Sequence, residues 1–213
     1  MKLILTLALI LSTSLASQAQ PSCLNCSESP TADLQKSCID SLVSQGYDVS
    51  SSDFIDACRR VVNVYSVRAV RKMTESRQEI ELATMNALVR VNGPLTFGCV
   101  AALIDNGYQL SSAFAEGCLE NSSRFSLEAI QLIAKSRQEI ELETLSSVAR
   151  ITSFFPDACI GTLVANGYSV SSPFAQACSL FCSESATRAL GSIAKSRREI
   201  TLDEMESLSR IGR

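Results

Sequence analysis

The residues of this sequence with the clearest chemistry are its nine cysteines. Six of them recur as three evenly spaced pairs: Cys38 with Cys58, Cys99 with Cys118, and Cys159 with Cys178. In an exported protein such pairs form disulfides, whereas in a reducing compartment they would pack as small buried thiols. The spacing favours three disulfides, each closing a loop of about 20 residues and worth roughly 3 kcal/mol by loop entropy.

The other three cysteines, Cys23, Cys26 and Cys182, leave an odd thiol. Cys23-x-x-Cys26 has the spacing of a redox site, but its polar surroundings lack the helix start and βαβ pattern of such sites. The alternatives are a disulfide between this segment and Cys182, or a disulfide-linked dimer through the odd cysteine. A zinc site from the three lacks an evident fourth ligand, and a c-type haem is excluded because no histidine follows Cys26.

The chain contains no histidine. This excludes Ser-His-Asp and Cys-His nucleophiles and metal sites built on imidazole. The sequence also has no P-loop, nucleophile elbow or Rossmann fingerprint. Paired carboxylates leave no sequence signature, so enzymes as a whole are not excluded. We nevertheless expect a non-catalytic protein with no catalytic residue, no metal and no cofactor.

Two sets of arginines recur along the chain: Arg77, Arg137 and Arg197, and Arg90, Arg150 and Arg210. One interpretation is a ladder of anion contacts along one face. The interpretation that we favour is ion pairing between helices or repeats, together with cations near helix C-termini. The tyrosines of the recurring Gly-Tyr steps are likewise expected to pack at helix ends rather than to form a stacking platform.

These features belong to one repeated unit of about 60 residues. Gly46, Gly107 and Gly167 are 61 and 60 residues apart, so duplication explains the chain. We predict helical repeats over 37–95, 96–155 and 156–213, preceded by a flexible polar arm over 20–36 that holds the Cys-x-x-Cys pair. The fold class is all-α, with three disulfide-stapled repeats stacked as a short α-solenoid or a compact helical array.

Each repeat is expected to begin with an antiparallel helical hairpin. The first helix ends at the Gly-Tyr step, where glycine takes the left-handed C′ position, and a serine then caps the second helix. Facing cysteines fall at similar heights in such a hairpin. For the second half of the repeat we favour two helices broken near the SRxEI stretch, because Thr201 to Glu204 forms a capping box. One long bent helix and short strands at EIEL are the alternatives.

Residues 1–19 have the pattern of a cleaved signal peptide, with Lys2, an apolar run that is too short to span a bilayer, and a small-x-small site ending at Ala19. No later stretch is expected to span a membrane. A net charge of −3 gives no basic footprint for nucleic acid. We therefore expect an exported protein, periplasmic or extracellular.

The function predicted from these features is an exported non-catalytic helical-repeat protein that binds or scaffolds a protein or an envelope component. One alternative is a thiol–disulfide redox protein that acts through Cys23 and Cys26. Another is a secreted inhibitor or effector, in which the disulfides confer resistance to proteases.

Overall fold

The computed structural model describes residues 30–49 and 52–212, and within these ranges the chain has twelve helices and no strand. The predicted all-α class is therefore confirmed, and strands at EIEL are not formed. The helices are α1 (Pro30–Ser44), α2 (Ser52–Arg59), α3 (Val64–Glu75), α4 (Leu82–Leu88), α5 (Pro94–Asp105), α6 (Ser112–Leu119), α7 (Arg124–Lys135), α8 (Leu142–Ala149), α9 (Phe154–Ala165), α10 (Ser172–Ser179), α11 (Glu184–Lys195) and α12 (Leu202–Ser209).

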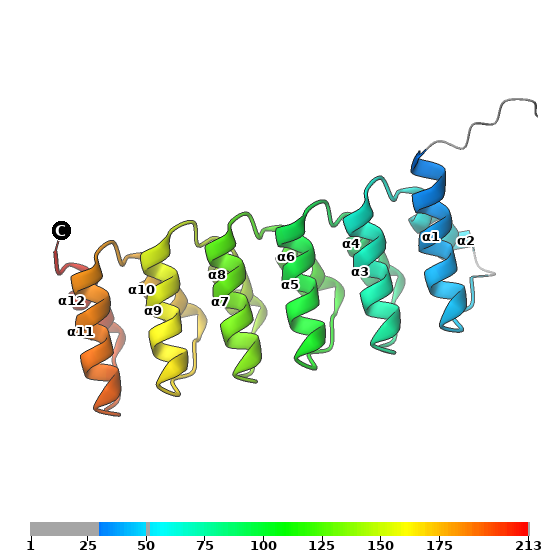
Figure 1. Ribbon diagram of the computed structural model, residues 1–213. Coiled ribbons are helices and arrows are strands. Elements are labelled where there is room, and N and C mark those ends of the chain that lie inside the picture. Colours follow the sequence, from blue (N-terminus) through cyan, green and yellow to red (C-terminus); the bar gives the residue numbers. More distant parts are fainter. Residues whose placement is uncertain (1–29, 50–51, 213) are drawn as a thin grey trace, which may run out of the picture.

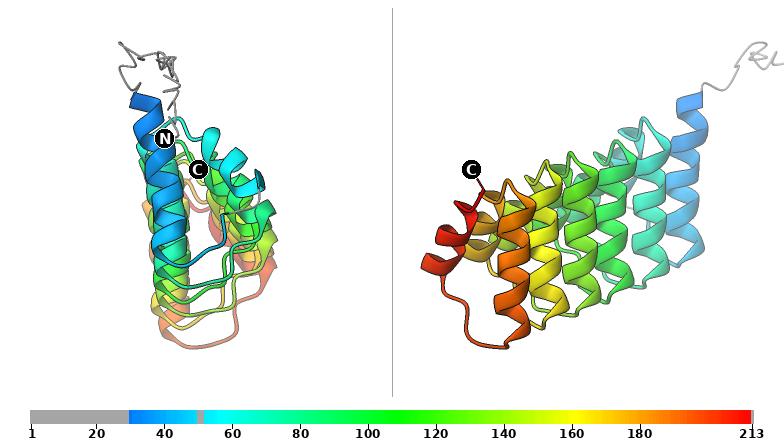
Figure 2. Two further views of the ribbon diagram at one scale, coloured as in Figure 1. Left: turned by 90° about the vertical axis from the view of Figure 1, so that its right-hand side faces the viewer. Right: turned by 60° about the vertical axis from the view of Figure 1, so that its left-hand side comes forward.

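Long and short helices alternate and form two layers. The long helices α1, α3, α5, α7, α9 and α11 stand side by side in a row, each in contact with the next (Figure 1). The short helices form a second row behind them, which is seen end-on in Figure 2. Each long helix and the short helix after it make an antiparallel hairpin of about 30 residues. The 60-residue sequence repeat thus contains two hairpins of one backbone design.

The row has two edges, which we name by their connections. At the turn edge each long helix turns into its short partner, and at the linker edge each short helix leads into the next long helix (Figure 1). The first hairpin of each sequence repeat has a Gly-Tyr step at the turn edge. The second hairpin has Arg-Gln or Arg-Arg at the aligned position.

The Gly-Tyr turns follow the expected helix stop. Gly46, Gly107 and Gly167 have φ of 81°, 86° and 82°, in the left-handed region. In the first of these turns the Tyr47 amide donates to the Leu42 carbonyl at 3.1 Å and the Gly46 amide donates to the Val43 carbonyl at 3.0 Å. This is the Schellman pattern, which satisfies the last carbonyls of the helix.

The second half of each repeat consists of two helices, so the single long bent helix is the wrong alternative. The break needs neither glycine nor proline, because an arginine takes the left-handed position instead: φ is 57° at Arg77, 55° at Arg137 and 54° at Arg197. The Thr201–Glu204 capping box is present at the start of α12. The equivalent helices α4 and α8 have Glu81 and Glu141 as their N-cap residues, and neither side chain makes a cap hydrogen bond.

Apolar side chains from both layers form one continuous core along the row. Disulfides join Cys38 to Cys58, Cys99 to Cys118 and Cys159 to Cys178, with Cα–Cα distances of 5.7, 5.5 and 5.5 Å. All six cysteines are fully buried. In the hairpins between them the aligned positions hold apolar pairs: Ala69 with Leu88, Ala129 with Val148, and Ala189 with Leu208.

Some predicted positions shift in the structure. Residues 30–36, assigned to the arm, lie in α1, because Pro30 fits the first turn of a helix and Asp33 is favourable there. The boundaries at 95/96 and 155/156 fall inside the first turns of α5 and α9, which begin at Pro94 and Phe154. The signal peptide and the Cys-x-x-Cys pair lie outside the described residues.

None of the helices in the described ranges has the length and apolar content to cross a bilayer.

Candidate functional site

A ladder of hydrogen bonds runs along the turn edge from hairpin to hairpin. Each tyrosine hydroxyl donates to a carbonyl in the next turn: Tyr47 to Gln78 at 2.5 Å, Tyr108 to Gln138, and Tyr168 to Arg198 at 2.6 Å. Burial raises the pKa of Tyr47 and of Tyr108, with Glu79 adding to the effect at Tyr47, so both phenols stay protonated donors. The tyrosines therefore join neighbouring turns by hydrogen bonds and do not form a stacking platform.

Glutamines continue this ladder in the same direction. Gln78 Nε2 donates to the Tyr108 carbonyl at 2.8 Å, and its Oε1 accepts from the Leu110 amide at 2.8 Å. In the same way, Gln138 Nε2 donates to the Tyr168 carbonyl at 2.8 Å, and Gln138 Oε1 accepts from the Val170 amide at 3.0 Å. Each of these two glutamine side chains thus bonds to the backbone of the next turn through both its amide nitrogen and its amide oxygen. These bonds fix the spacing of neighbouring turns.

The left-handed arginines lie on this edge, and none of them forms an ion pair with another described residue. Arg77, Arg137 and Arg197 are exposed, and within the described part of the chain no carboxylate pairs with them. Two arginines of the second set behave differently, whereas no ion pair is found for Arg210 among the described residues. Arg90 pairs with Glu116 at 2.6 Å and Arg150 with Glu120 at 3.1 Å, both between hairpins near the linker edge. Ion pairing therefore accounts for Arg90 and Arg150 but not for the left-handed set.

Each left-handed arginine lines a surface pocket together with the Gly-Tyr turn of the hairpin before it. The three pockets have volumes of about 380, 480 and 570 Å³ toward the C-terminal end of the row. Their shared lining is one arginine, one glycine and one tyrosine: Arg77 with Gly46 and Tyr47, Arg137 with Gly107 and Tyr108, and Arg197 with Gly167 and Tyr168. The turn edge is thus a row of three equivalent pockets, which we call the arginine pockets.

The charge around the arginine pockets changes along the row. Glu75 and Glu79 flank Arg77, whereas Lys135 and Glu139 flank Arg137, and Lys195 and Glu199 flank Arg197. The middle pocket also holds Asp105, which forms an ion pair with Lys72. The residue aligned with Asp105 in the last pocket is Ala165. The most positive surroundings therefore belong to the Arg197 pocket.

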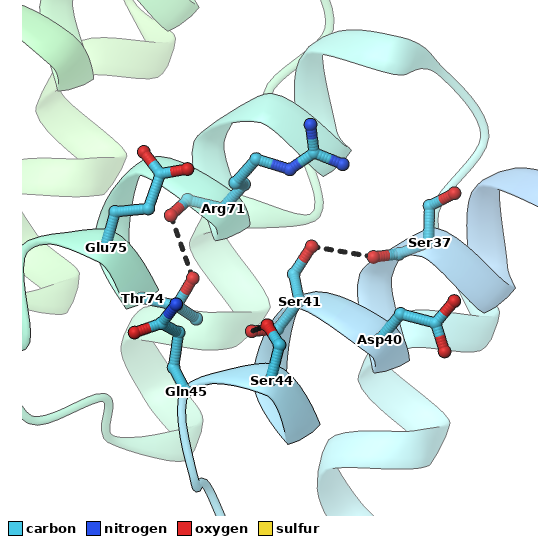
Figure 3. Close-up of a pocket in the computed structure, with 8 residues that line it drawn as sticks. All are labelled: Ser37, Asp40, Ser41, Ser44, Gln45, Arg71, Thr74 and Glu75. Carbon is cyan, nitrogen blue, oxygen red and sulfur yellow. Dashed lines mark hydrogen bonds between the residues drawn. The ribbon is translucent and has the colours of Figure 1, made fainter.

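A groove between α1 and α3 extends the first arginine pocket. It has a volume of about 280 Å³ and is lined by Ser37, Asp40, Ser41, Ser44, Gln45, Arg71, Thr74 and Glu75 (Figure 3). Three of its hydroxyls donate to carbonyls of their own helices: Ser41 to Ser37 at 2.7 Å, Ser44 to Ser41 at 3.1 Å and Thr74 to Arg71 at 2.8 Å (Figure 3). These donors are already used, which leaves Arg71 as the group in the groove best suited to hold an anion.

One buried carboxyl stands apart from the turn edge. Asp157, in the first turn of α9, is 8% exposed, and its Oδ1 has no hydrogen-bond partner. Burial, with a smaller contribution from Glu128, raises its pKa to about 6. The aligned residues Val67 and Leu127 are apolar. Burial disfavours the ionised form of a carboxyl, because the charge loses its contact with water.

Cys182 lies in the linker between the end of α10 at Ser179 and the start of α11 at Glu184, and it is exposed. Among the residues that the structure describes, it has no disulfide partner. The other two cysteines of the predicted extra disulfide or redox pair, Cys23 and Cys26, lie outside the described residues, so their pairing stays a prediction.

The described residues contain no cluster of three or more His, Cys, Asp or Glu side chains placed to hold a metal ion. Comparison of the chain with protein-family models, with curated proteins and with solved structures gave no match. The site must therefore be interpreted from its own geometry.

Sequence reasoning missed the unpaired state of the arginines and the glutamine ladder. A signal for both was present. If the chain is aligned at half the repeat, Ser-Arg-Gln falls on Asn-Gly-Tyr, so arginine stands where a helix-stopping glycine is expected.

Proposed function

We propose that this chain is an exported, non-catalytic helical-repeat protein whose three 60-residue units form a short α-solenoid. It acts as a binding or scaffold module for a protein or an envelope component, and it contacts that partner through the turn edge. Three equivalent pockets support this proposal, each with an exposed arginine that has no ion-pair partner within residues 30–49 and 52–212. A row of like sites on an extended array suits an elongated ligand.

The disulfides support the proposed export. Three fully buried disulfides are consistent with folding in an oxidising space, periplasmic or extracellular. Cys182, exposed on this array, could link two copies of the chain, and a non-reducing intact mass tests for that dimer.

Site-specific photo-crosslinking tests the proposed contact surface. A photoreactive residue at Ser169 lies on the turn edge beside Tyr168, and one at Thr152, also exposed, lies on the linker edge as a matched control. With envelope or secreted fractions of the producing cell, we expect a saturable crosslink to one partner from Ser169 only. This crosslink should disappear when all three left-handed arginines are replaced by glycine. Equal crosslinking from both edges would contradict the proposal.

The alternatives make separable predictions. A redox protein that acts through Cys23 and Cys26 would reduce insulin disulfides and would lose this activity in Cys23→Ser. A secreted inhibitor or effector would act on a target enzyme or cell without being held in an envelope complex.

A further inference from the structure

The arginine pockets show which chemistry they would recognise. Building on the proposed function, we infer that they bind carboxylate groups of an extended acidic segment of a partner protein, one carboxylate per pocket. The pocket of Arg197 is the strongest of the three sites, and the pocket of Arg77 is the weakest.

The first argument is the residue type at the left-handed position. A side chain with a β-carbon is strained at φ near 55°, and glycine fills the aligned turns without that strain. Arginine nevertheless occupies the position in all three hairpins that lack a disulfide. Strained backbone conformations cluster at functional sites. We therefore attribute the arginine to its guanidinium rather than to the turn.

The second argument is the match between guanidinium and carboxylate. A guanidinium presents donors in a planar fork that binds both oxygens of one carboxylate. Each pocket offers one such fork, and each turn also carries a glutamate: Glu79, Glu139 or Glu199. The whole chain has a net charge of −3. Single, separated negative charges fit this surface better than the dense charge of a phosphate polymer does.

The third argument ranks the sites. Residues 75–79 hold one arginine against two glutamates, whereas residues 135–139 hold a lysine and an arginine against one glutamate. Residues 195–199 hold a lysine and two arginines against one glutamate, and Arg198 pairs with Glu204 at 2.7 Å. The pocket of Arg197 is also the largest of the three, at about 570 Å³, and unlike the pocket of Arg137 it has no acidic residue in its lining.

The fourth argument sets the spacing of the ligand. Successive arginine pockets are two hairpins apart, which corresponds to about 16–20 Å for packed helices. An extended peptide rises about 3.3 Å per residue. Carboxylates about five or six residues apart would therefore reach neighbouring pockets at the same time, and binding at several pockets would raise the overall affinity.

Fluorescence anisotropy with synthetic peptides on the full disulfide-bonded protein tests this inference. The probe is a flexible peptide whose only charged side chains are three glutamates about six residues apart. Its controls replace the glutamates by glutamine or place them side by side. Inorganic polyphosphate serves as the competing anion. The protein variants are Arg77→Gly, Arg137→Gly, Arg197→Gly and their combination. The matched control is the combination Arg90→Ala, Arg150→Ala and Arg210→Ala, which removes the same charge at the same period near the other edge.

We expect the spaced glutamate peptide to bind more tightly than either control peptide. The triple glycine variant should lose at least about tenfold in affinity, whereas the matched control should lose much less. Arg197→Gly should cost more than Arg137→Gly, and Arg77→Gly should cost least. Glycine occurs at the aligned turns, so these variants are expected to fold, and thermal melts check this.

Three results would overturn the inference. They are equal binding of glutamate and glutamine peptides, unchanged affinity in the triple glycine variant, and preferential binding of polyphosphate. If none of the peptides binds but Ser169 still crosslinks a partner in an arginine-dependent way, the carboxylate assignment fails and the proposed function stands. If that crosslink is absent as well, both fail.

Discussion

Replacing the left-handed arginines by glycine should stabilise the protein. A residue with a β-carbon pays about 1–2 kcal/mol in the left-handed region. Two effects reduce this gain in stability. Glycine loses more conformational entropy on folding, which costs about 0.5–1 kcal/mol, and the loss of a cation near a helix C-terminus costs about 0.3 kcal/mol. The net gain is about 0.5 kcal/mol per site, or about 1.5 kcal/mol for the three positions with φ of 57°, 55° and 54°.

The comparison with alanine isolates the backbone contribution. Arginine to alanine at the same three positions removes the same charge but keeps the β-carbon in the left-handed region, so this variant should be less stable than the wild type. The glycine and alanine triples should differ by about 1 kcal/mol per site. For a chain of this length, the stabilisation by glycine corresponds to a rise of Tm of about 3–6 °C in calorimetry. Equal stability of the two triples would refute the strain argument.

This result would also bear on function. If the glycine variant is more stable but no longer binds the acidic peptide, the wild-type arginines lower the stability of the protein and serve to bind the ligand at the three pockets. If it is more stable and binds as before, the arginines serve some other purpose.

Three further predictions concern the rest of the array. Cys99→Ala with Cys118→Leu copies the Ala–Leu pairs of the other hairpins, so in denaturant titrations it should cost clearly less than the double serine variant; both lose the roughly 3 kcal/mol of the cross-link, but the serines also bury two hydroxyl groups. Gln138→Ala removes two hydrogen bonds to the next turn and should cost about 1–3 kcal/mol, with faster amide exchange at Val170. Burial raises the pKa of Asp157 to about 6 in the folded state, above its ordinary 3.8. The folded state therefore keeps this proton to a higher pH than the unfolded state does, and the stability of the protein falls as the pH rises through 6. The advantage of Asp157→Asn over wild type should therefore be near zero at pH 4 and reach about 1 kcal/mol above pH 7, after a discount for screening near the surface; a constant difference across this range would contradict the assignment.

The sequence predicted the features that depend on local chemistry. Gly46 and its equivalents stop helices wherever they occur, and the Thr201–Glu204 capping box starts one, so both are visible without tertiary context. The cysteine spacing also led to the bonded pairs found in the structure, because a hairpin turn fixes which positions face each other. The start of α1 was missed because Pro30 suits both a loop and a helix start.

What the sequence did not predict depends on contacts between hairpins. The role of Gln78 becomes visible only when the next turn lies beside it, since both of its bonds go to residues at least 30 positions away. The solvent-facing state of Arg137 depends in the same way on which carboxylates the packing brings near, and none forms a pair with it in the described ranges. Pairing preferences of exposed charges are weak, so their spacing alone does not settle them.

The alternation of hairpins links the disulfides to the arginine pockets. Each pocket lies between a hairpin that carries a disulfide, which supplies the glycine and the tyrosine, and the following hairpin without one, which supplies the arginine. The disulfide holds together the hairpin that forms the tyrosine wall, and the tyrosine hydroxyl then bonds to the turn that carries the arginine. A repeat of about 60 residues is therefore the smallest unit that contains a whole pocket, even though about 30 residues suffice to build a hairpin. Under the proposed function, this unit size matches the sequence period, which is twice that of the backbone hairpins.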